Sequence, residues 1–199
     1  IAQSKSEYLK ANENDLTLKN YFFPQSNFNI IGFSATHGSA KPYDAELNLI
    51  KALKKQDLLD YYIVETNYSQ AYFIQEYLNN GNEELLKELT YGFQTIVSQE
   101  GTIETFNHWK NIRNLNLMYP NKPIKVIGCD IINEYTFTIR HILSLTKDDE
   151  SWSERESLKN IQNTDNSTIW NKELRIIVKS FVDDYSSNKS KYENLILDI

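Results

Sequence analysis

The chain has 199 residues, of which 21 are Lys or Arg and 27 are Asp or Glu, so its net charge is −6 at neutral pH. A chain of this length fits one domain of ordinary size with a hydrophobic core, and a division into two domains is compatible with the length but not required by it. The acidic balance argues against a nucleic-acid partner or an anionic membrane surface, because both require a basic face. No apolar stretch reaches the length that spans a bilayer. We therefore expect a soluble protein, with its location in the cytoplasm or outside the cell and its oligomeric state left open.

The first part of the chain combines a polar segment with a predicted strand–helix–strand unit. Residues 1–27 are polar and carry a short helical pattern. The apolar run 29–35 predicts a first, buried strand, and Pro42 then begins a helix whose apolar residues recur at helical spacing. A second strand follows at 61–65, so these elements form a βαβ unit with a right-handed crossover.

The remainder of the chain is mostly helical in its pattern. Helices are predicted at about 68–80, where residues 79–81 end the helix, at 82–90 and at 102–117. A third strand, 124–129, follows two prolines, and further helices are predicted at 133–146 and 168–186 on either side of a charged break at 147–150. The pattern predicts an α/β domain over residues 28–199, with a mostly parallel sheet, helices on both faces and a helical C-terminal section.

Polar residues follow each of the three predicted strands at the same end. The first run leads into the turn that holds Thr36 and His37, the second ends on Glu65 with Asn67 just beyond it, and the third ends on Asp130. Side chains at the carboxyl ends of parallel strands converge on one crevice, where ligands bind in α/β proteins. This convergence predicts an enzyme site.

Signatures of common cofactors are absent from the sequence. It has no glycine-rich dinucleotide fingerprint, no phosphate-binding loop with its lysine, and no paired-histidine or Cys/His zinc motif. We therefore predict no cofactor and favour hydrolysis over redox chemistry or phosphoryl transfer. The single cysteine, Cys129, lies in a predicted buried strand and is expected to be a structural thiol.

The order of these motifs resembles the N-terminal half of the erythromycin esterase family. The motifs are the run 32–38 followed by an amphipathic helix, the strand end 63–67, an aromatic-rich helix with Trp109 and Asn114, and the strand 127–130. The match covers about residues 28–135. The resemblance implies an α/β fold with a deep cleft, hydrolysis of an ester or macrocyclic lactone, and functional roles for His37 and Glu65. The layout is more distantly similar to the haem-uptake and Tiki-type metalloprotease group.

The sequence departs from the family pattern in two ways. Ser34 occupies the position three residues before the histidine, where the family has an acidic residue. The family chain also continues beyond the third strand and contributes further cleft residues, so we expect the domain to be incomplete at its C-terminus.

Ester hydrolysis requires a base to activate water, a group that orients the base, and donors for the oxyanion. His37 is the natural base, and Glu65 would hold its tautomer or take the proton itself. Ser34, Thr36, Asn67 and Asp130 are candidates for binding or orienting the substrate, and Asp130 could instead cap the next helix.

Two alternative functions stay open. One is a catalytically inactive relative that binds a small ligand in the cleft that active members use for catalysis. Ser34 and the missing later half of the family pattern favour this alternative. The other is a metal-dependent hydrolase with His37, Glu65 and Asp130 as ligands. His108 and His141 lie on predicted helices and are read as surface or packing residues, whereas Trp109 is expected in the core.

Overall fold

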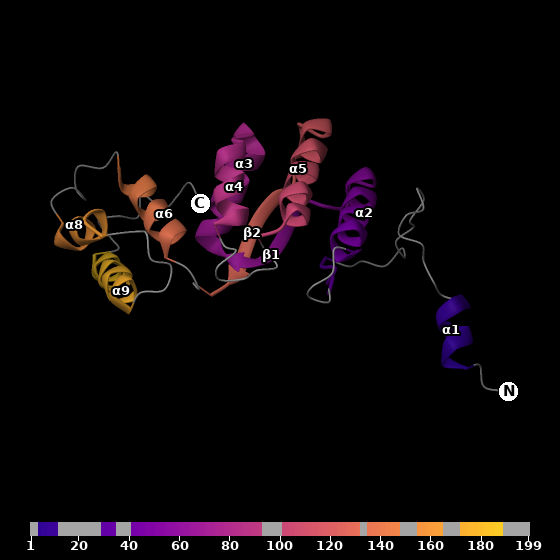
Figure 1. The fold of residues 1–199 in the computed structure, drawn as a ribbon, viewed down its shortest axis with the longest axis horizontal. Coiled ribbons are helices and arrows are strands. Elements are labelled where there is room, and N and C mark those ends of the chain that lie inside the picture. The colour runs from indigo at the N-terminus through magenta and orange to yellow at the C-terminus, as the bar shows by residue number, and fades with distance from the viewer. Residues whose placement is uncertain are drawn as a thin grey trace. The chain divides into compact units, whose positions relative to one another are not determined.

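The structure is a computed structural model that describes residues 4–11, 29–34, 41–92, 101–131, 135–147, 155–164 and 172–188. The fold of these residues is mixed α/β and mostly helical, with one small parallel sheet (Figure 1). The described helices are α1 (Lys5–Ala11), α2 (Lys41–Lys55), α3 (Tyr68–Asn80), α4 (Glu83–Tyr91), α5 (Ile103–Met118), α6 (Thr136–Thr146), α8 (Glu156–Gln162) and α9 (Lys172–Ser187). The described strands are β1 (Tyr61–Asn67) and β2 (Lys125–Asp130).

The sheet is smaller than the sequence predicts. It contains β1 and β2 as parallel neighbours, which are the second and third predicted strands. The predicted first strand is wrong over residues 29–34, which are not in a strand, and Ile30 is 82% exposed. An apolar run forms a strand only where another strand accepts its backbone hydrogen bonds, and within the described residues this run has no such neighbour. The predicted βαβ unit is therefore not formed there.

In the part of the chain that the structure describes, one face of the sheet is exposed to solvent, so the prediction of helices on both faces is wrong for these residues. Exposed residues alternate with less exposed ones along β1 and β2, as expected when one face of a sheet is covered. The alternating exposed positions are Tyr61, Ile63, Glu65, Lys125, Ile127 and Cys129, and Asp130 at the end of β2 is exposed as well. Cys129 was predicted to be buried, and this prediction is wrong because the residue lies on the open face. Its thiol donates a hydrogen bond to the Val64 carbonyl oxygen at 3.3 Å.

The chain divides into two compact units. Unit 1 comprises residues 1–62 and 78–125, and unit 2 comprises residues 63–77 and 126–199. In unit 1, α5 packs against both α2 and α4, and Figure 1 shows α2 and α5 side by side. The apolar side chains that α2, α4 and α5 bury include Leu47, Ile50, Leu53, Leu85, Leu86, Phe106, Trp109 and Ile112. The prediction that Trp109 lies in the core is confirmed.

Unit 2 has its own hydrophobic core. This core is formed by α6, α8 and α9, with α8 packed against both of the other two helices (Figure 1). Its buried residues are Ile139, Leu158, Ile161, Leu174, Val178 and Phe181. Within the described residues, no helix combines the length and the apolar character needed to cross a membrane.

The predicted helices from residue 41 to residue 118 are confirmed to within one residue, because their ends carry local signals. Asn82 caps α4 by accepting hydrogen bonds from the amides of Glu84 and Leu85 at 3.1 and 3.2 Å. Thr102 caps α5 in the same way. Gly81 follows α3 with φ +76°, a left-handed conformation that glycine adopts without strain.

Candidate active site at the ends of two parallel strands

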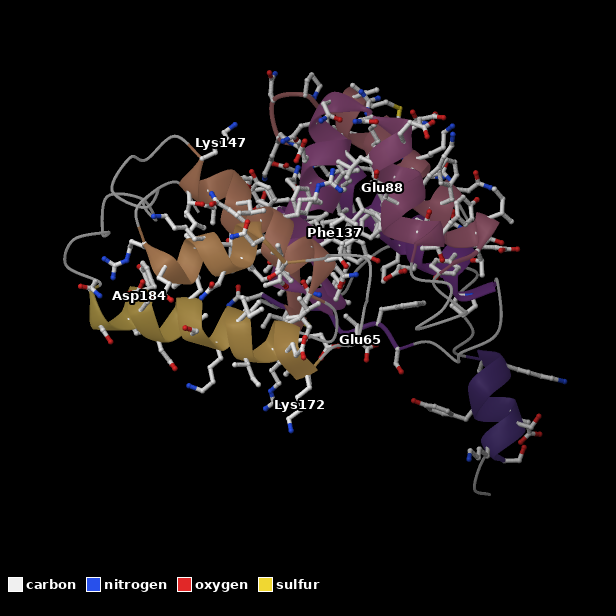
Figure 2. All side chains as sticks on the ribbon, turned by 60° about the vertical axis from the view of Figure 1, so that its left-hand side comes forward. Glu65, Glu88, Phe137, Lys147, Lys172 and Asp184 are labelled. Atoms are coloured by element: carbon white, nitrogen blue, oxygen red, sulfur yellow. The ribbon has the colours of Figure 1, made fainter. Side chains whose placement is uncertain are left out.

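Three of the predicted site residues lie at the carboxyl ends of β1 and β2 in unit 2. Glu65 and Asn67 are the fifth and seventh residues of β1, and Asp130 is the last residue of β2. The two strands are parallel neighbours, so their carboxyl ends share one edge of the sheet. Glu65, labelled in Figure 2, and Asp130 are both exposed to solvent. Two carboxylates at this edge are accessible to a substrate.

Asp130 also organises the backbone that follows β2. Its Oδ1 accepts a hydrogen bond from the Ile131 amide at 2.7 Å. The alternative that Asp130 caps the next helix is wrong, because α6 begins at Thr136 and Tyr135 precedes it without a side-chain cap. The Asp130 carboxylate is therefore held at the strand end.

Asn67 is a fully buried residue that joins β1 to α3. Its Oδ1 accepts a hydrogen bond from the Gln70 amide at 3.0 Å, as an N-cap does. Its Nδ2 donates to Oε1 of Gln70 at 2.6 Å, and the hydroxyl of Thr66 donates to the same oxygen at 2.7 Å. Because Asn67 is 0% exposed, this network fixes the turn that follows Glu65. Its role as a donor to substrate stays a prediction.

Gly128 allows the two strands to approach closely just before Asp130. A Cβ atom at this position would lie 2.4 Å from the Asn67 carbonyl oxygen and 2.6 Å from that of Thr66. No other amino acid fits this space without a backbone shift. On the other side of β2, the Val126 amide donates to the Gln75 side-chain oxygen at 2.8 Å, so α3 also holds the strand.

The described structure does not place the other predicted site residues, Ser34, Thr36 and His37, at the carboxyl edge of β1 and β2. Ser34 belongs to unit 1, where it is exposed and outside any strand. Thr36 and His37 lie outside the described residues. Among the residues that are described, no group of three or more His, Cys, Asp or Glu side chains could hold a metal ion. The predicted ligand set of the metal-dependent alternative includes His37, so that alternative is not tested.

The two described histidines are buried packing residues. The sequence predicted either a surface position or a packing role for them, and the structure shows the packing role. His108 and His141 are each 4% exposed, and burial lowers the pKa of both rings, that of His108 to about 4. His141, in unit 2, stacks on Tyr72 with ring centroids 4.1 Å apart, and its Nδ1 is hydrogen-bonded to the Ser69 hydroxyl at 3.2 Å. Each ring has one buried nitrogen that lacks a hydrogen-bond partner within the described structure.

Sequence reasoning missed the surroundings of His108 in unit 1. Glu46 of α2 and Tyr62 of β1 both approach its ring, although neither was singled out in the sequence. A signal was present in the spacing, since His108 falls on the buried stripe of α5 together with Thr105 and Ile112. That spacing places the ring in the core but says nothing of the groups that face it.

Comparison with known proteins gives no match to a family model, a curated protein or a solved structure. Any assignment of function therefore depends on the residues themselves and on the geometry described above.

Proposed function

We propose that the chain is an erythromycin-esterase-like hydrolase, which cleaves an ester or a macrocyclic lactone by general-base activation of water. The observation that carries the proposal is the placement of Glu65 and Asp130 at the shared carboxyl edge of β1 and β2. The order of the sequence motifs, with the Thr36–Gly38 turn before them, supports it.

In the proposed reaction, His37 takes a proton from water and the resulting hydroxide attacks the ester carbonyl. The bond from the carbonyl carbon to the alkoxy oxygen then breaks, and the imidazolium returns its proton to that leaving oxygen. Glu65 holds the imidazole in the tautomer that can accept the proton and stabilises its charged form. A lactone would open to a hydroxy acid by the same steps. The exposure of Glu65 supports this role, because a carboxylate that meets substrate needs an accessible position.

The test is hydrolysis of simple esters and macrolide lactones by the purified protein. Ring opening is followed by mass spectrometry as the gain of one water. His37→Ala and Glu65→Gln are each expected to reduce turnover at least about 100-fold. His141→Gln is the control, because it alters a buried histidine that packs on α3. Equal turnover by His37→Ala and the unmodified protein would refute the assignment of the base.

A second candidate function is a binding module, which Ser34 favours because it lacks the carboxylate of the family pattern. This candidate predicts saturable binding of a lactone with no turnover. Absence of hydrolysis for both substrate classes, together with measurable binding, would replace the hydrolase proposal with this one. Turnover that requires a divalent cation would instead support the metal-dependent hydrolase, with His37, Glu65 and Asp130 as ligands.

A further inference from the structure

A second group of polar and aromatic side chains lies in unit 1, and we call it the His108 cluster. It consists of Tyr43 and Glu46 of α2, Tyr62 of β1, and His108 and Trp109 of α5. The His108 ring centroid lies 5.4 Å from that of Tyr43, 6.0 Å from that of Tyr62 and 5.4 Å from that of Trp109. Aromatic rings from three elements therefore surround the imidazole, and water has little access to it.

The two nitrogens of the His108 ring differ in their surroundings. Nε2 is hydrogen-bonded to the Tyr62 hydroxyl at 3.3 Å and lies 4.0 Å from Oε2 of Glu46. Nδ1 is buried and has no hydrogen-bond partner within the described structure. A neutral imidazole fits this arrangement, because it can leave Nδ1 as an unprotonated acceptor and place its single proton on Nε2. A protonated ring does not fit, because its second N–H would be buried without an acceptor.

We propose that His108 is an acid-sensitive latch, whose protonation loosens the packing of α2 against α5. In the closed state, α2 is packed against α5 and its Tyr43 and Glu46 help to enclose the His108 ring. This enclosure requires the neutral ring, because a protonated ring would have a buried N–H without an acceptor. When the ring gains a proton, water must reach Nδ1 to stabilise the charge. Water can reach this nitrogen only if α2 and α5 separate near His108, and we call this the open state.

Glu46 does not stabilise the protonated ring well enough to keep the two helices together. Among the described residues it is the carboxylate in ion-pair range of the ring, at the 4.0 Å limit, and it lies near Nε2 rather than Nδ1. The other titratable groups that face the ring are the phenols of Tyr43 on α2 and Tyr62 on β1, which stay neutral in acid. None of these groups accepts the proton of Nδ1, so the desolvation cost of the charged ring is not offset.

The expected size of the effect follows from proton linkage. Burial lowers the pKa of His108 from the ordinary value of 6.5 to about 4. The ring therefore binds its proton more weakly in the closed state than in the open state. As the pH falls from 6.5 to about 4, protonation shifts the equilibrium towards the open state. The ratio of open to closed molecules at this contact should therefore rise about 100-fold between pH 7 and pH 4.

The test is amide hydrogen exchange of α2 at pH 7 and pH 4, corrected for the intrinsic pH dependence of exchange. In the unmodified protein, α2 amides should exchange about 100-fold faster at pH 4 than at pH 7 after this correction. His108→Gln should remove most of that acceleration, because glutamine does not titrate. His141→Gln is the matched control, since it removes the other buried histidine, in unit 2, and should leave the acceleration in α2 unchanged.

Equal acceleration of α2 in His108→Gln and in the unmodified protein would overturn the proposal. A second measurement needs no variant, namely NMR titration of the His108 Cε1 proton in the unmodified protein. Titration near pH 4, together with faster exchange in α2, supports the latch. Titration near pH 6.5, or titration near pH 4 without any change in α2, overturns it.

Discussion

Replacing Gly128 by alanine should destabilise the protein through a steric clash between β2 and β1. The added Cβ would lie 2.4 Å from the Asn67 carbonyl oxygen, whereas ordinary contacts of this kind begin at 3.4 Å. One strand must therefore move by about 1 Å. Excess volume at a well-packed position costs about 1–3 kcal/mol. Because the clash is with the backbone carbonyls of two successive residues, Thr66 and Asn67, we expect about 2 kcal/mol.

Gly32→Ala is the matched control for this substitution. A Cβ at Gly32 meets no atom within 4 Å, so the same change in sequence carries no clash there. Alanine at such a site is neutral or stabilises by up to about 1 kcal/mol, because it restricts the unfolded chain. Urea unfolding followed by circular dichroism should place the midpoint of Gly128→Ala about 1 M below that of Gly32→Ala. Equal midpoints for the two variants would show that the strands are not held at this separation.

Three further substitutions test contacts made by polar side chains. Asn116→Leu removes both hydrogen bonds to the buried Ile124 backbone, at 2.8 and 3.1 Å, and should cost about 2–4 kcal/mol by thermal unfolding. Asn67→Ala removes the cap of α3 and should cost about 1–2 kcal/mol in the same assay, and an unchanged melting temperature would contradict the cap. The Arg155 guanidinium beside Asp184 lowers the pKa of that carboxyl to about 2. The charged carboxylate stabilises the fold above the ordinary pKa of 3.8, and this stabilisation is lost as the pH falls towards 2. Between pH 5 and pH 2, the free energy of unfolding of Asp184→Asn should therefore fall by about 1 kcal/mol less than that of the unmodified protein.

Local signals in the sequence were sufficient to predict the helices that precede β2. The apolar spacing along 41–55 and the cap residues Asn82 and Thr102 act within one or two turns, so they can be read without knowing the fold. The strands 61–65 and 124–129 were also predicted, although β1 extends to Asn67 and β2 covers 125–130.

Helix α8 was missed because its stability depends on residues that are distant in the sequence. It has seven residues, and Arg155 precedes it without a side-chain cap. Its buried Leu158 and Ile161 belong to the core that α9 completes. Ser157 and Arg155 both donate to the Asp184 carboxylate, which lies 29 residues beyond Arg155 on α9 and is labelled in Figure 2. A pattern search within a short window does not detect such contacts.

The wrong predictions for residues 29–34 and for Cys129 share one physical cause. Both assumed a wide sheet covered on two faces, in which every apolar strand is buried. In a sheet that pairs β1 with β2 and has one open face, alternate residues such as Ile63 and Cys129 face solvent. For the candidate site, the position of Glu65 and Asp130 at one sheet edge could be predicted from strand order, whereas the burial of Asn67 could not, because it depends on Gln70 and the start of α3.

The division of the chain has a practical consequence for any attempt to isolate its parts. The polypeptide passes between unit 1 and unit 2 three times, after Tyr62, after Tyr77 and after Lys125. Each passage falls inside a regular element, namely β1, α3 and β2. A single protease cut at any of these points would break a strand or a helix. The shortest uninterrupted fragment that contains all of unit 1 is 1–125, which also carries residues 63–77 of unit 2, and the shortest that contains all of unit 2 is 63–199, which also carries residues 78–125 of unit 1. Neither unit can therefore be isolated by truncation without residues of the other, and a spliced gene that joins the two segments of one unit is needed instead.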